Sequence, residues 1–280
     1  MSRDRGVVYV AISGNRPGFF DECLRSIAAL RACSTLPVTV FTDHPALLAR
    51  ALAGVPEVAV VPLEASRSPF KLKVEAQLRA PYARHLFLDT DTYPLADPSD
   101  LLDRLDTQDL AIANAPRRAP DPADPTGRRT VISGCDGQGL NTGVFALRKS
   151  PAVLDLLSEW QAAVEAVADG DLRQGRGDQL YFNRLYLAGR LQALGIGLEV
   201  LDNRVHNVRP GMLPLLRAAG LLGQIRLLHV KHTPAELGAA WPELAGAPAL
   251  AAAARVPPLR TPAPADMSAA APGHPDRTPG

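Results

Sequence analysis

The chain has 280 residues, 46% of them hydrophobic and only 5% aromatic, so it can bury a sizeable core filled mainly by aliphatic side chains. Its 30 Lys and Arg residues nearly balance its 29 Asp and Glu residues, and a net charge of +1 gives no electrostatic reason to expect a nucleic-acid-binding protein. No apolar run approaches the ~20 residues that cross a bilayer, so we expect no integral membrane segment.

The N-terminal part of the chain alternates between strand-like apolar runs and helical spacing. The runs are short and partly β-branched, and they predict strands at residues 7–12, 38–41, 58–61, 85–88 and 110–113. Helices are expected between them, one opening at Pro17 and others at residues 45–53, 72–78 and 101–105. This βαβα order predicts an α/β fold with a mostly parallel central sheet and helices on both faces.

The extreme N-terminus and the cysteines bear on the compartment. Arg3 and Arg5 precede the first apolar run, as in a signal peptide, but the run is too short and no convincing cleavage site follows. The 3 cysteines form no CxxC pair, which argues against a disulfide framework or a structural zinc site. Cys23 falls on the apolar face of a predicted helix and is expected to be buried. We therefore expect a cytoplasmic protein.

The rest of the chain is less regular. Residues 115–139 carry many Pro, Asp, Arg and Gly without periodicity, which predicts a long loop. Later elements are expected as a strand at 140–147, a helix at 151–167 with Trp160 on its apolar face, a Gly-rich linker at 170–177, a helix at 178–188 and strands at 198–201 and 225–230. From residue 257 onward, Pro, Ala and small polar residues predict a disordered tail.

Asp89-Thr90-Asp91 follows the apolar run at residues 85–88 directly. In parallel sheets, ligands bind outside the carboxyl ends of strands. Two carboxylates placed there suit a hard divalent cation, Mn²⁺ or Mg²⁺, whose open coordination positions could take the oxygens of a leaving diphosphate. The alternative is an ordinary strand-end turn, where Asp residues are common. The spacing alone leaves both interpretations open.

Other polar residues also follow predicted strands. Ser13 comes after the first strand and Asp43 after the second. Backbone groups of Ala11 and Ser13 would form the floor of a nucleotide site at this edge. Asp43 could accept hydrogen bonds from a base or ribose, or it could cap the helix at residues 45–53, and both roles stay open.

Four segments carry polar motifs in a fixed order. They are Lys71-Leu72-Lys73 with Tyr82-Ala83-Arg84-His85-Leu86-Phe87-Leu88-Asp89-Thr90-Asp91-Thr92, then Leu140-Asn141-Thr142-Gly143-Val144, Gly177-Asp178-Gln179 and His229-Val230-Lys231-His232. Together they resemble the GT-A glycosyltransferases, and most of all the glycogenin-like and lipopolysaccharide-galactosyltransferase-like group with its nucleotide-diphospho-sugar transferase relatives. Each motif is weak alone, whereas their joint order across about residues 7–232 is far more specific.

The resemblance implies a Rossmann-like GT-A domain over residues 1–256. Its donor-binding half would cover about residues 1–114 and its acceptor-side half about 140–256, with the tail at 257–280. It also implies a metal-dependent glycosyltransferase that moves a sugar from a nucleotide-diphosphate sugar, expected to be a UDP-sugar, to a hydroxyl acceptor with retention of configuration. The acceptor would be recognised by residues 115–139 and the C-terminal part.

The resemblance also assigns roles to individual residues. The metal ligands would be Asp89, Asp91 and His229. The sugar-facing catalytic residues would be Asn141, Asp178 and Gln179. Contacts to the nucleotide and diphosphate would come from Ala11, Ser13, Asp43, Lys71, Lys73, Asp89, Thr90 and Lys231.

Three of these assignments carry open choices. Lys71 and Lys73 cannot share a helix face, so at most one reaches the phosphates, and Lys71 is slightly preferred. The family's Gly-x-x-Lys-Pro-Trp downstream of the late histidine is absent, which leaves His229 and His232 as alternatives for the third ligand. Asp178 could instead cap its helix. A nearby polar cluster lines either the acceptor side or a surface loop, and consists of Asn203, Arg204, His206 and Asn207.

Two other functions compete with this one. A haloacid-dehalogenase-like phosphohydrolase also places Asp-x-Asp after a strand, with the first Asp as nucleophile. It normally does so after its first strand and with a Thr two residues beyond the second Asp, where this chain has Tyr93. A sugar-nucleotide-binding protein without turnover is the other alternative, because the full His-Gly-Lys signature is missing.

Overall fold

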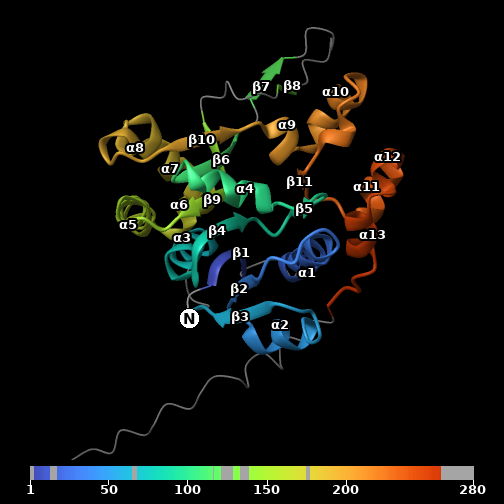
Figure 1. Cartoon of the computed structure of the whole chain (residues 1–280), viewed down its shortest axis with the longest axis horizontal. Coiled ribbons are helices and arrows are strands. Elements are labelled where there is room, and N and C mark those ends of the chain that lie inside the picture. Colours follow the sequence, from blue (N-terminus) through green and yellow to red (C-terminus); the bar gives the residue numbers. More distant parts are fainter. Residues whose placement is uncertain are drawn as a thin grey trace, which may run out of the picture.

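The computed structural model describes residues 3–12, 18–64, 68–115, 117–120, 129–132, 139–174 and 177–259. Its strands are β1 Arg3–Ala11, β2 Val38–Thr42, β3 Val58–Pro62, β4 Tyr82–Leu88, β5 Thr92–Pro94, β6 Leu110–Asn114, β7 Arg117–Pro120, β8 Arg129–Ile132, β9 Leu140–Arg148, β10 Leu198–Leu201 and β11 Leu227–His229 (Figure 1).

The longer helices are α1 Gly18–Arg31, α3 Pro69–Arg79, α5 Pro151–Glu165 and α7 Asp178–Leu187. Shorter helices are α2 Pro45–Ala51, α4 Ser99–Asp103, α6 Asp169–Gln174, α8 Arg190–Ala193, α9 Asn203–His206, α10 Leu213–Ala218, α11 Pro234–Ala240, α12 Pro242–Ala245 and α13 Pro248–Ala254. Single 3-10 turns occur at η1 Arg104–Asp106, η2 Pro210–Met212 and η3 Leu222–Gln224.

A central sheet organises the described residues, with strand order β10-β6-β9-β4-β1-β2-β3. Only β9 runs against its neighbours β4 and β6; the other pairings are parallel. The mixed, mostly parallel α/β sheet expected from the sequence is therefore confirmed. The carboxyl ends of β1, β2, β4 and β6 share one edge with the start of β9, so residues far apart in sequence meet there.

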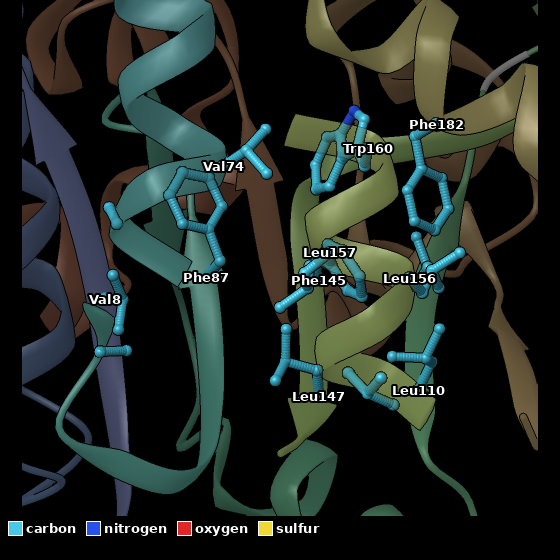
Figure 2. Close-up of a cluster of buried hydrophobic side chains, with 14 of the residues drawn as sticks. Val8, Val74, Phe87, Leu110, Phe145, Leu147, Leu156, Leu157, Trp160 and Phe182 are labelled. Atoms are coloured by element: carbon cyan, nitrogen blue, oxygen red, sulfur yellow. The ribbon is translucent and has the colours of Figure 1, made fainter. Parts of the chain in front are cut away.

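Helices cover both faces of the sheet, with α3 and α5 on one side and α1 on the other (Figure 1). The α5 side holds the aromatic core, where the rings of Phe145, Trp160 and Phe182 contact one another at centroid distances of 5.0–6.1 Å (Figure 2). Helix α5 begins where Ser150 accepts a hydrogen bond from Val153 N. The α1 side is mostly aliphatic and includes Cys23, which is buried as expected.

A second, two-stranded sheet stands beside the central one. Strand β5 follows the acidic triplet and pairs antiparallel with β11, opposing His229 to Thr92 and Leu228 to Tyr93. Tyr93 and Leu228 pack with a third apolar cluster, which helices α10, α11, α12 and α13 supply. This small sheet joins the C-terminal helices to the end of β4.

Three sequence expectations need correction. Residues 115–139 are not a structureless loop, because β7 and β8 pair antiparallel with Arg117 opposite Ile132. Such strands form through backbone hydrogen bonds, and these two are too short to give a periodic signal in the sequence. Residues 170–177 include most of α6, where Asp169 and Asp171 favour the helix N-terminus and Leu172 is buried.

The third correction concerns the tail expected from residue 257. Leu259 packs against the aliphatic core, and its backbone N donates to Asp21 Oδ1 of α1 at 2.7 Å. The first residues of that segment are therefore held against the domain. Residues 260–280 lie outside the described residues.

Candidate functional site

The acidic triplet lies at the carboxyl end of β4, where a tight turn leads into β5. Asp89 N donates to Gly143 O of β9 at 2.9 Å, which continues the β4–β9 pairing by one residue. Thr92 then bonds back to Asp89 O through both its N at 3.2 Å and its Oγ1 at 2.8 Å. The turn therefore brings both carboxylates to the same side of the chain.

His229 reaches the triplet because β11 pairs with β5. Val230 N donates to Asp91 O at 2.8 Å, so the two chain segments are joined at the site itself. His229 Nε2 lies 3.0 Å from Asp91 Oδ1 and 3.6 Å from Asp89 Oδ2. His232 is exposed, and its backbone O accepts from Tyr93 Oη. Of the two histidines left open by the sequence, the structure brings His229 to the carboxylates.

The three side chains have the donor set of a divalent-cation site. One ligand atom from each of Asp89, Asp91 and His229 lies within 4.8 Å of the others. Ligands about 2.1 Å from an octahedral ion and at right angles lie roughly 3 Å apart, which is close to the separation of His229 Nε2 and Asp91 Oδ1. Burial tends to raise the pKa of Asp91, but a protonated His229, with Arg209 and Lys231, outweighs it and holds the pKa below its usual value. The residues therefore fit Mn²⁺ or Mg²⁺.

Lys73 connects the triplet to the start of α7. Its Nζ donates to Asp89 Oδ1 at 3.0 Å and to Thr142 Oγ1 at 3.2 Å, and it lies 3.3 Å from Asp178 Oδ2. Burial would lower the pKa of Lys73, but the two carboxylates outweigh this and raise it, so the ammonium stays charged.

The slight preference for Lys71 over Lys73 is corrected by this geometry. Lys71 points away from the triplet and pairs with Asp169 of α6 at 2.9 Å. The sequence argument that the two lysines cannot share a helix face holds, but the face that α3 turns to β4 carries Lys73.

Lys73→Met is expected to lower the free energy of unfolding by about 3 kcal/mol, because it strands the buried carboxylate of Asp178 without its cation. We place the loss at the lower end for a broken buried pair because Asp89 is one-third exposed and regains water. The control is Lys71→Met, whose partner Asp169 is 43% exposed and which should cost less than about 1 kcal/mol. Urea unfolding followed by circular dichroism measures the free energy of unfolding of both variants. Equal losses would show that the ion pairs of Lys73 contribute no more than an exposed ion pair does.

Asp178 is the first helical residue of α7 and is 4% exposed. Gly177 is the N-cap residue, so the cap interpretation of Asp178 is wrong. Its Oδ2 accepts from Thr142 Oγ1 at 2.7 Å, and its backbone O accepts from Trp160 Nε1 at 2.9 Å. Burial raises the pKa of Asp178, opposed chiefly by Lys73. Gly177 has φ +57°, and a side chain there would collide with the ring of Phe70, so the chain needs glycine at this approach.

Asn141 and Gln179 link β9 to α7. Asn141 Nδ2 donates to Gln179 Oε1 at 3.2 Å, and Asn141 Oδ1 accepts from Gly143 N at 2.9 Å. Gly143 itself lies against the ligands: a β-carbon there would collide with Asp89 Oδ2 and lie 2.5 Å from His229 Cε1. The Asn-Thr-Gly segment therefore forms a wall of the cation site.

The remaining predicted residues lie around this centre or outside the described residues. Ala11 is buried at the end of β1, and Thr90 is buried with its Oγ1 donating to Glu22 Oε2 at 3.4 Å. Asp43 follows β2, and because His44 is the N-cap residue of α2, the cap interpretation of Asp43 is wrong. Lys231 is exposed two residues beyond His229. Ser13 lies outside the described residues.

A family model described as nucleotide-diphospho-sugar transferase matches residues 83–213, just under half of the chain. The matched span opens on β4 and includes the triplet, the Asn-Thr-Gly segment and Asp178-Gln179. Over this span the chain resembles nucleotide-diphospho-sugar transferases. No curated protein matches it significantly in sequence.

Solved structures show which fold the chain has. The WbbM bifunctional glycosyltransferase in its apo form is 12% identical with a TM-score of 0.50, covering 82% of this chain and 46% of that one. Mouse xyloside xylosyltransferase 1, also apo, is 18% identical with a TM-score of 0.50, covering 81% of this chain and 97% of that one. The chain thus spans less than half the length of the first structure. At these identities the likeness concerns the fold, which is of the GT-A type.

Several contacts of this site have no signal in the sequence. Thr142 was named only within its motif, yet its hydroxyl touches both Lys73 and Asp178. Asn207 was placed on an acceptor side or a surface loop, yet it is fully buried and its Oδ1 lies 2.8 Å from His229 Nδ1. Trp160, expected to pack on the apolar face of its helix, also donates a hydrogen bond from its Nε1 to Asp178 O. Only the pairing of distant segments brings these groups together, so no local sequence pattern predicts these contacts.

Every helix in the described part of the chain is too short or too polar to cross a membrane.

Proposed function

We propose that the protein transfers a sugar from a nucleotide-diphosphate sugar, specifically a UDP-sugar, to a hydroxyl acceptor in a metal-dependent reaction that retains anomeric configuration. The observation that carries this proposal is the convergence of Asp89, Asp91 and His229 at the carboxyl edge of the sheet. The phosphohydrolase alternative is disfavoured, because the matched family model describes nucleotide-diphospho-sugar transferases and the fold is of the GT-A type. A sugar-nucleotide-binding protein without turnover stays the alternative. The cytoplasmic location stays a prediction.

In the proposed site, Asp89, Asp91 and His229 hold Mn²⁺ or Mg²⁺. When bound, the cation supplies positive charge opposite the diphosphate as the sugar leaves. Lys231, exposed beside the ligands, binds the outer diphosphate oxygens as a point charge. Asp91 is the firmer carboxylate ligand, because Asp89 divides its two oxygens between Lys73 and His229.

The nucleotide and the sugar occupy opposite sides of the cation in this proposal. The nucleotide lies over the ends of β1 and β2, where Ala11, Ser13 and Asp43 contact it and Thr90 closes the floor. The sugar lies against Asn141, Asp178 and Gln179. The hydrogen bond from Asn141 to Gln179 and the bond that Asp178 accepts from Thr142 fix their positions before the donor arrives. Lys73 takes a supporting role, because all three of its contacts are to protein groups.

The acceptor enters from the C-terminal half. We propose residues 1–114 as the donor-binding half and residues 140–256 as the acceptor-side half of one domain. The β7–β8 hairpin would take part in choosing the acceptor, since it joins the two halves. The attacking hydroxyl approaches on the face that the diphosphate leaves, so no strong general base is needed from the protein.

The proposed function predicts which donor is turned over and with what stereochemistry. Purified protein with Mn²⁺ and a panel of nucleotide sugars should release nucleoside diphosphate from a UDP-sugar, and chelation should abolish release. Proton NMR of the glycoside formed from an α-linked donor should show an α-linkage. Release unaffected by chelator would refute metal dependence, a β-linked product would refute retention, and cleavage of a phosphate monoester without turnover of any donor would refute glycosyl transfer.

A further inference from the structure

The imidazole of His229 contacts the side-chain amide of Asn207 through the ring nitrogen that does not face the carboxylates. Its Nδ1 lies 2.8 Å from Asn207 Oδ1, while its Nε2 faces the carboxylates of Asp89 and Asp91. The His229 side chain is 2% exposed and Asn207 is fully buried, so no solvent competes for this contact. The two ring nitrogens of His229 therefore have fixed and different partners.

The orientation of the Asn207 amide is fixed by a third residue. Its Nδ2 donates to the backbone O of Asn114, at the end of β6, at 3.2 Å. Turning the amide over would set its oxygen against that carbonyl oxygen, and two acceptors repel. Because Nδ2 is held by Asn114 O, Oδ1 is the atom that faces the imidazole.

An amide oxygen can only accept a hydrogen bond, so Nδ1 of His229 must carry the hydrogen. A neutral imidazole has one N–H, which leaves Nε2 with its lone pair directed at Asp91 Oδ1, 3.0 Å away. Two lone pairs at that distance repel unless a positive charge lies between them. The same contact that fixes the tautomer therefore prepares Nε2 to bind a cation.

The fold places Asn207 for this contact. Asn207 follows α9, and the next residue, Val208, bridges in parallel to Leu228 of β11. His229 N donates to Val208 O at 2.9 Å, so backbone and side chain hold the histidine together. The contact thus joins the ends of three segments: β6, α9 and β11.

We propose that Asn207 is a positioning residue that holds His229 in its Nδ1–H tautomer, so that Nε2 is presented as a metal ligand. The proposal rests on the metal site of the proposed function. Partners behind metal-bound histidines commonly change metal affinity about 10- to 100-fold when removed. Asn207→Leu should therefore weaken Mn²⁺ binding in that range.

The experiment measures Mn²⁺ binding to the full chain without a donor, by the electron paramagnetic resonance signal of free Mn²⁺. Asn207→Asp keeps an acceptor for Nδ1–H but sets its second oxygen against Asn114 O, so it should bind more weakly than wild type and more tightly than Asn207→Leu. His232→Asn, at an exposed histidine in the same segment, should bind as wild type does. An Asn207→Leu variant that binds as tightly as wild type, or an Asn207→Asp variant as weak as the Leu variant, would overturn the proposal.

A second readout does not depend on the metal. Long-range ¹H–¹⁵N spectra of the metal-free protein, at a pH where His229 is neutral, should show the Nδ1–H tautomer in wild type and a mixture in Asn207→Leu. Finding the Nε2–H tautomer in wild type would overturn the proposal even if Mn²⁺ binds. Should the Leu variant not fold, Asn207→Ser, whose hydroxyl is too short to reach Nδ1, replaces it in both measurements. If wild type binds no Mn²⁺, the proposed function itself fails and this inference with it.

Discussion

Asp91→Asn is expected to abolish measurable Mn²⁺ binding and to lower kcat/KM for donor turnover by at least about 10²-fold. The amide keeps the shape of the carboxylate and removes its charge. Asp91 should matter more than Asp89 because its side chain is only 12% exposed and its Oδ1 lies nearer His229 Nε2, at 3.0 Å. Asp89 shares its charge with Lys73 as well.

Mn²⁺ titration and the release of nucleoside diphosphate measure this effect, with thermal unfolding as the check on the fold. The matched control is Asp97→Asn, the same substitution a few residues downstream. Asp97 Oδ1 accepts from Ser99 N at 3.1 Å, and the amide oxygen can keep that bond, so activity should be unchanged. A folded Asp91→Asn protein that binds Mn²⁺ like wild type would remove Asp91 from the site.

Gly143→Ala should weaken Mn²⁺ binding about 100-fold although it adds only one methyl group. That carbon would collide with Asp89 Oδ2, lie 2.5 Å from His229 Cε1 and lie 2.9 Å from Asn141 Oδ1. Two metal ligands and a sugar-side residue must therefore shift together. We expect the cost to stability to be about 1–3 kcal/mol, typical of overpacking, so the protein should remain folded while its site is deformed.

Gly139→Ala is the control for Gly143→Ala, since it makes the same change just before β9. A β-carbon at Gly139 would have Asn183 Oδ1 as its nearest neighbour, at 3.4 Å, which is an ordinary contact. Mn²⁺ affinity and donor turnover should match wild type in this variant. If Gly143→Ala also kept wild-type affinity, the close packing of β9 against the ligands would have no functional role.

The elements of the central sheet were predictable because burial on both faces forces short apolar strands, such as β4 and β6. Asp89 and Asp91 were predictable for a related reason, since a strand covered on both faces ends where polar residues begin. The short helix α6 was missed because two glycines and several polar residues obscure its pattern. Its buried Leu172 is the only apolar residue that holds it to the core.

The choice between Lys71 and Lys73 could not be made from sequence. Both lysines lie on the same helix, two residues apart, and the choice depends on which face of α3 meets β4. Leu72, Val74 and Ala76 are all buried, so the apolar pattern of α3 is too broad to fix its rotation. Only the packed structure shows that Lys73 meets Asp89 and Asp178.

The role of Asn207 could not be predicted from the sequence, for another reason. Its contact with His229 exists only because β11 pairs with β5 and Val208 bridges to β11. Pairings between distant segments leave no local trace in composition or spacing. The sequence therefore marks Asn207 only as part of a polar cluster on an acceptor side or a surface loop, and it does not indicate the partner of Asn207.

Because β5 pairs with β11, a bound cation would also affect the stability of the fold. Asp91 and His229 lie roughly 140 positions apart in the chain, and an ion bound to both would cross-link the two strands of the small sheet. Its binding energy would then add directly to the stability of the folded state. The C-terminal helices, which pack on that sheet, would be the first part of the domain to loosen when the ion leaves. Donor capture and the integrity of the C-terminal third would thus be governed by the same ion.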